Sequence, residues 1–156
     1  MTDCCCPEPA IEARRQCPVC AAPGLAVEAL TLKALLAPTA MARLTHVAFY
    51  FCAAPSCDTV YFAQSGEIFR TADLRVAVWQ KQPAGSRTLC YCFGENEADM
   101  QGELETQGKT LAVERVRQHV AARRCACEIR NPRGACCLAD LVSATKRLKA
   151  SAGAVS

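Results

Sequence analysis

Cysteine is the residue type in this chain that could carry chemistry, because 13 of its 156 residues are cysteines and they stand in groups. The first residues contain no basic segment followed by an apolar run, so no signal peptide is expected and a cytoplasmic protein is predicted. Thiols stay reduced in that compartment, where grouped cysteines are more often metal ligands than disulfides. The odd number of cysteines also fits poorly with a closed set of disulfides. The sequence therefore favours metal binding.

The first group contains Cys17 and Cys20 in a Cys-x-x-Cys turn, with Cys52 and Cys57 further along the chain. Two such pairs supply four thiolates, the closed tetrahedral shell that Zn²⁺ prefers in structural sites. Two alternatives are that His46 replaces one of these ligands or that the cysteines are free. We predict a structural zinc site.

The second group differs in spacing, because Cys90 and Cys92 are separated by a single residue. Such a pair can bind iron while later cysteines complete a 2Fe–2S cluster. The later candidates are Cys125, Cys127, Cys136 and Cys137. A second zinc site is the main competing interpretation of this group.

The sequence patterns of the segments between the cysteines predict an α+β fold. We expect a small zinc-stapled antiparallel β domain over residues 17–82, followed by a helical 2Fe–2S-binding domain over residues 88–150. Residues 1–16 are predicted to be a flexible arm. Residues 25–36 are expected to run from a strand into a short helix. The β-branched and aromatic residues predict further strands near residues 47–52, 59–62, 67–69 and 74–79.

The second half of the chain has helical periodicity. Asn96 is predicted to cap a helix that ends near Gln107, before Gly108. Val113, Val116 and Val120 predict an apolar stripe on a second helix, and a third follows from Leu138. We expect the pair Cys90 and Cys92 to lead directly into these helices and not into a hairpin.

Four motifs together resemble the amino-terminal zinc and 2Fe–2S domain of CopZ-type copper chaperones. They are Cys17-Pro-x-Cys20, Phe51-Cys52-x4-Cys57-x-x-Val60-Tyr61-Phe62, Cys90-Tyr91-Cys92 and Cys127-x3-Asn131-Pro132-x-Gly134-x-Cys136-Cys137. The second half is similar to the bacterioferritin-associated ferredoxin type of 2Fe–2S domain. The resemblance implies zinc at Cys17, Cys20, Cys52 and Cys57. It implies a 2Fe–2S cluster at Cys90, Cys92, Cys127 and Cys137, with Cys136 and Cys125 as rival ligands.

Copper handling is the function that this resemblance implies, with a copper ion and a copper-handling ATPase or chaperone as partners. Copper chaperones of this type carry a further domain with a Met-x-Cys-x-x-Cys copper loop, which is not found after residue 148. Cys4, Cys5 and Cys6 are therefore a candidate substitute site, since clustered soft thiolates suit Cu(I). The alternative is that the terminus is cysteine-rich by accident.

Three function classes remain open from the sequence. The first is a redox metalloprotein for copper handling, whose cluster transfers single electrons, for example to reduce Cu(II) to Cu(I); its electron-donor protein is unknown. The second is a metal-stabilised adaptor or sensor, and the third a zinc-ribbon nucleic-acid binder. A net charge of +3 and the lack of a basic aromatic motif make nucleic acid the weakest of these. His46 and His119 lack a catalytic triad or carboxylate pair, so an enzyme is not expected, and no apolar run is long enough to span a membrane.

Overall fold

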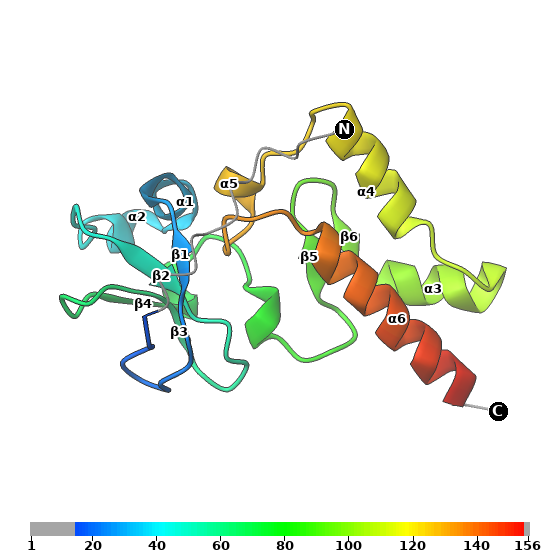
Figure 1. Cartoon of the computed structure of the whole chain (residues 1–156), viewed down its shortest axis with the longest axis horizontal. Coiled ribbons are helices and arrows are strands. Elements are labelled where there is room, and N and C mark those ends of the chain that lie inside the picture. The colour runs from blue at the N-terminus through cyan, green and yellow to red at the C-terminus, as the bar shows by residue number, and fades with distance from the viewer. Residues whose placement is uncertain (1–14, 155–156) are drawn as a thin grey trace.

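A four-stranded antiparallel sheet forms the centre of the first half of the chain. The computed structural model describes residues 15–154 (Figure 1), and the strands follow one another in chain order across the sheet. Their bounds are β1 (Leu25–Val27), β2 (Phe49–Phe51), β3 (Thr59–Phe62) and β4 (Ile68–Arg70). Tyr50 lies opposite Phe62, and Phe51 lies opposite Tyr61. These aromatic residues are the types that the pleated, buried surface of a sheet favours.

Both faces of the two central strands are buried, and alternation divides their side chains between two cores. Phe51, Tyr61 and Phe69 pack on one face against Leu32 and Leu36. That face is covered by the helices α1 (Ala29–Leu35) and α2 (Pro38–Met41). On the other face, the rings of Tyr50 and Phe62 pack against three cysteines. Because these cores are small, burial alone supplies limited stability to this half, and a bound metal would supplement it.

The predicted strand over residues 74–79 is wrong. Two single turns of 3₁₀ helix flank this segment, η2 (Thr71–Asp73) before it and η3 (Trp79–Lys81) at its end. Leu74 makes only an isolated bridge, to Leu36 at the end of α1. The fourth strand of the sheet is β1, at the start of the segment that was predicted to run from strand to helix. Pro38 follows that segment and begins α2 at its first turn.

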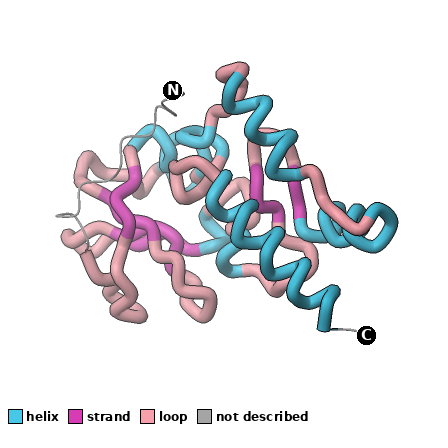
Figure 2. The backbone as a smooth tube through the Cα atoms, turned by 45° about the vertical axis from the view of Figure 1, so that its right-hand side comes forward, coloured by secondary structure: helices cyan, strands magenta, loops and turns pink. Residues whose placement is uncertain are grey.

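A short hairpin opens the second half of the chain. Its strands β5 (Thr88–Cys90) and β6 (Glu95–Asn96) form a sheet of their own, separate from the first (Figure 2). The second cysteine group therefore begins at a hairpin tip, and the expectation that it opens directly onto helices is wrong. The cause is the turn at Gly94, with φ of 72°, whose N–H donates to the carbonyl of Cys90 at 2.9 Å.

Helices make up the rest of the second half. They are α3 (Glu97–Gln107), α4 (Ala112–Ala121), α5 (Cys127–Arg130) and α6 (Leu138–Ala154). Asn96 caps α3 by accepting from the N–H of Asp99 at 2.9 Å, and Gly108 ends it with φ of 74°. Met100, Val116 and Leu141 from three helices meet in one buried core. The predicted α+β fold and the bounds of α3 are thus confirmed.

The two halves pack side by side, with α5 above their boundary in Figure 1. Helix α5 belongs to the second half by sequence but packs against α1 of the first. Within residues 15–154, none of the helices has the length and apolar character needed to cross a bilayer.

Candidate metal centres

Four thiols from two segments meet beside the first sheet. The sulfur atoms of Cys17, Cys20, Cys52 and Cys57 all lie within 4.8 Å of one another. The sulfurs of Cys20 and Cys52 are 3.6 Å apart, and those of Cys17 and Cys57 are 4.0 Å apart. Four sulfurs at about 2.3 Å from one tetrahedral ion stand about 3.8 Å apart. The donor set of this first thiol group therefore fits a single zinc ion.

Two turns hold the first thiol group in place. In the Cys-x-x-Cys turn, the N–H of Cys17 donates to the carbonyl of Ala22 at 2.8 Å, and Ala21 donates back to the Cys17 carbonyl at 2.8 Å. The second turn joins β2 to β3, where the N–H of Cys52 pairs with the Val60 carbonyl at 2.9 Å. The cysteine pair Cys52 and Cys57 thus lies at a hairpin end, as the sequence predicts.

The protonation of this group depends on its partners. Burial raises the pKa of Cys52 to about 12, against the opposing effects of a hydrogen bond from Ala54 N–H and of the Lys81 ammonium. Burial also acts on Cys57, but hydrogen bonds from the hydroxyl and N–H of Thr59 outweigh it and lower that pKa to about 7. The four thiols therefore do not all ionise at neutral pH without a cation. Zinc binding must displace protons, so zinc affinity decreases as the pH falls.

A second thiol group lies where the β5–β6 hairpin meets α5 and the loop between α5 and α6. The sulfurs of Cys92 and Cys127, 35 residues apart in sequence, are 3.8 Å apart. The thiols of Cys127 and Cys90 lie near enough to that of Cys137 to raise its pKa. The four thiols for which the family resemblance implies a cluster therefore lie near one another. An all-sulfur set of this kind has the donor chemistry of a 2Fe–2S centre.

The rival cysteines lie at the edge of the second thiol group. Cys136 is partly buried, and its thiol lowers the pKa of Cys127. Cys137, its neighbour, is only 2% exposed. Cys125 is partly buried and precedes α5. The deeper position and double contact of Cys137 favour it over Cys136 as the inner thiol.

Backbone N–H groups point at the sulfurs of the second thiol group. The N–H of Ala126 donates to Cys92 Sγ at 3.2 Å, although burial still raises the pKa of that thiol to about 12. A hydrogen bond from Cys137 lowers the pKa of Cys90, assisted by the N–H groups of Phe93 and Cys92. Such N–H groups stabilise sulfur in its anionic form, which is the form that binds metal.

Some predicted candidates lie away from both groups. His46 is exposed and is not one of the four clustered donors of the first thiol group. His119 stacks on Phe93, with ring centroids 4.0 Å apart and planes at 12°. Cys4, Cys5 and Cys6 fall outside the described residues.

Sequence reasoning missed the polar residues that support the thiols. Lys81 Nζ lies 3.7 Å from Cys52 Sγ and donates to the carbonyl of Ala54 at 2.6 Å. No motif identifies it, because it follows Cys52 by 29 residues and reaches the site only through the tertiary fold. Tyr91 could have been identified, since it stands between two predicted ligands.

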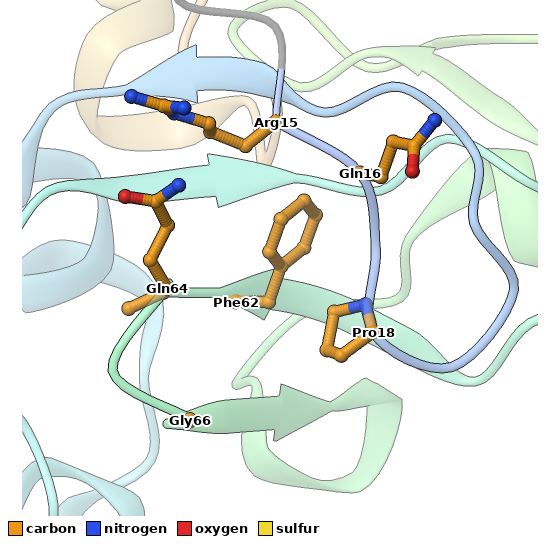
Figure 3. A pocket seen from close by; sticks show the side chains of 7 residues that line it. Arg15, Gln16, Pro18, Phe62, Gln64 and Gly66 are labelled. Atoms are coloured by element: carbon orange, nitrogen blue, oxygen red, sulfur yellow. The ribbon is translucent and has the colours of Figure 1, made fainter.

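A cavity of about 460 Å³ also lies near the first thiol group (Figure 3). Figure 3 shows the Phe62 ring between Pro18 and Gln64. The cavity is lined by Arg15, Gln16, Pro18, Phe62, Ala63, Gln64 and Gly66. None of these lining residues offers a thiol or an imidazole, so the cavity lacks the soft donors of the two thiol groups.

A small α+β fold that brings four cysteine thiols within 4.8 Å of one another, without disulfides among the described cysteines, defines a cysteine-based metal-binding protein. The zinc-binding domain family of CopZ matches residues 14–75. The X-ray structure of the Archaeoglobus fulgidus CopZ N-terminal domain superposes with a TM-score of 0.69 at 31% identity, over 83% of this chain and 96% of that one. This chain belongs to the family of CopZ-type N-terminal domains.

A curated relative is the copper chaperone CopZ of Archaeoglobus fulgidus, 32% identical over 122 residues. The alignment covers 78% of this chain but 57% of that protein. The chain therefore spans little more than half the length of the curated relative it matches.

Proposed function

We propose that this protein handles copper as a metallochaperone-like redox protein in the cytoplasm, with zinc at the first thiol group and a 2Fe–2S cluster at the second. The observation that carries the proposal is the second thiol group, in which thiols 35 residues apart in sequence lie 3.8 Å from each other. One structural zinc site, such as the first thiol group, would suffice to stabilise a small domain. A second all-thiol group supports a separate role, and the name of the curated relative supports copper as the cargo.

The two groups would have different tasks. The first offers four thiols and no vacant ligand position, so its zinc would be structural. A bound 2Fe–2S cluster would supply one-electron chemistry at the second. The chain's own contribution there is to hold the sulfurs and to direct N–H groups at Cys90 and Cys92. An electron from a donor protein, passed on to Cu(II), would give Cu(I) in a balanced one-electron step.

The thiol contacts also suggest how the ligands are shared. Cys92 contacts Cys127, and Cys90 contacts Cys137, so each thiol of the hairpin has a neighbour from the later loop. A bound cluster would therefore take two thiols from the hairpin and two from the later segment.

Metal analysis with a visible spectrum tests the proposal. Anaerobically purified protein is expected to contain one zinc and two irons per chain, to be brown, and to give a rhombic spin-half signal after dithionite reduction. Cu(II) added to the reduced protein should restore the oxidised spectrum and yield Cu(I) in equal amount to the electrons lost. Colourless protein with two zinc ions after iron and sulfide reconstitution would contradict the cluster, and Cu(II) that leaves the reduced spectrum unchanged would contradict copper reduction.

We propose Cu(I) binding by the thiols of Cys4, Cys5 and Cys6. Three adjacent thiols form a soft, low-coordinate donor set, which Cu(I) prefers to harder ligands. Deletion of residues 1–10 is expected to lower the Cu(I) affinity by at least ten-fold under reducing conditions, while zinc content and colour are retained. Competition with a Cu(I) chelator measures this affinity. An unchanged affinity and stoichiometry would show that these cysteines are not a copper site.

A further inference from the structure

The first half of the protein hydrogen-bonds with the segment between Cys127 and Cys137. Tyr61, on β3, is fully buried, and its hydroxyl donates to the carbonyl of Pro132 at 2.6 Å. Thr31, on α1, is also fully buried and donates to the carbonyl of Glu128 at 2.6 Å. Both acceptors lie between Cys127 and the vicinal cysteine pair. Two hydroxyls from the zinc-binding half thus hold the backbone between cluster thiols.

The loop packs closely against the zinc-binding half at Gly134. A Cβ atom at this position would lie 2.9 Å from Thr31 Oγ1 and 3.3 Å from a methyl group of Val27. Its φ of +72° is also one that glycine adopts without strain. The turn is closed internally by Asn131, which donates to the carbonyl of Ala135 at 2.7 Å. The loop is therefore shaped to dock on α1 and β1.

The hairpin with the other two thiols is tied to the same half through Tyr91. Its hydroxyl accepts from the N–H of Trp79 at 3.0 Å and donates to the carbonyl of Ala77 at 2.6 Å. Lys81, two residues after Trp79, contacts the sulfur of Cys52 in the first thiol group. Residues 77–81 therefore contact a ligand of one group and the residue between two ligands of the other.

We propose that Tyr61, Thr31 and Tyr91 are positioning residues through which the zinc-binding half holds both segments of the second thiol group, so that zinc occupancy governs how firmly the cluster is retained. This inference rests on the proposed cluster. Burial keeps the pKa of Tyr61 well above its usual range, so its hydroxyl remains a donor over the whole physiological range. If zinc is lost, β3 and α1 lose their support and the loop between Cys127 and Cys137 is released. The protein would then lose its redox centre together with its zinc.

The test compares variants of the full chain that each lack one hydroxyl group. Tyr61→Phe and Thr31→Val each remove one hydroxyl and keep the packing shape. Tyr50→Phe is the control, because Tyr50 lies opposite Phe62 on the neighbouring strand and packs beside the first thiol group, not the loop. The first measurement is the half-life of the visible absorbance in the presence of an iron chelator. The second is the electron paramagnetic resonance spectrum of the reduced protein. The third is amide hydrogen exchange of residues 127–137 in zinc-loaded, cluster-free protein.

Removing a buried hydroxyl leaves the loop carbonyl unpaired, so Tyr61→Phe should shorten the cluster half-life by roughly ten-fold and speed loop exchange similarly. The resonance signal should also change shape, which a uniform loss of stability would not cause. Zinc content should stay at the wild-type value. The proposal is overturned if Tyr61→Phe and Thr31→Val match Tyr50→Phe in both half-life and loop exchange. A wild-type protein that takes up no cluster would instead overturn the proposed function, while loop exchange still decides the positioning role.

Discussion

Replacing Cys57 by Ser is expected to abolish zinc binding and to unfold the first half of the protein. Cys57 is 5% exposed and lies within 4.8 Å of the three other thiols of the first thiol group. Structural zinc contributes on the order of 10–16 kcal/mol of binding free energy, as much as the whole stability of a typical domain, about 5–15 kcal/mol. The small cores on the two faces of the sheet cannot replace a contribution of that size.

The measurement is zinc content together with amide exchange along the chain. The zinc-to-protein ratio should fall from about one to below about 0.1, since a serine hydroxyl is a poor substitute for thiolate. Exchange over residues 17–70 should approach that of an unfolded chain. Cys125→Ser is the control, because Cys125 lies outside the first thiol group and should leave zinc content unchanged. A Cys57→Ser protein that keeps a full complement of zinc would refute this assignment.

The consequence for the second half follows from the contacts of Tyr61 and Thr31. If β3 and α1 unfold, the loop carbonyls of Pro132 and Glu128 lose their donors. The proposed cluster should therefore be lost with the zinc. Two independent domains would behave differently, since the cluster would then survive zinc removal.

Local patterns were sufficient to predict much of this fold. The bounds of α3 follow from Asn96 and Gly108, each of which acts on the adjacent helix end through its own backbone preference. The hairpin from β2 to β3 follows from aromatic residues that favour a buried sheet. In both cases the residues that determine the structure lie within a few positions of it.

The parts that were predicted wrongly or missed depend on contacts distant in sequence. Residues 74–79 resemble a strand, but Leu74 meets the end of α1 instead of β4, which leaves no ladder to continue. Lys81 reaches Cys52 across 29 residues, and Tyr61 reaches Pro132 across 71. Such partners share no spacing rule, because the fold alone brings them together. The cysteines themselves could be grouped from sequence since metal ligands come in short, regular pairs.

The vicinal cysteines provide the sharpest test of the second thiol group. Cys137 is 2% exposed and its thiol contacts those of both Cys90 and Cys127, whereas Cys136 is more exposed. Hydrogen bonds with those two thiols raise the pKa of Cys137, so a cation that binds here must displace its proton as well as that of Cys92. Exchanging the thiol for a hydroxyl at the inner position should therefore affect the cluster most.

Cys137→Ser is accordingly expected to lose the cluster or to shift its visible bands, with iron content reduced by at least five-fold, while one zinc per chain remains. Cys136→Ser is the matched control, because it makes the same atomic change one residue away and should retain both iron and colour. Iron, sulfide and zinc analysis of the two variants, with their reduced-state resonance spectra, measures the difference. The opposite result, with colour lost in Cys136→Ser and kept in Cys137→Ser, would assign the ligand to Cys136. Loss in both variants would instead indicate that the loop tolerates no change beside Cys127, whose thiol contacts Cys136 and Cys137 alike.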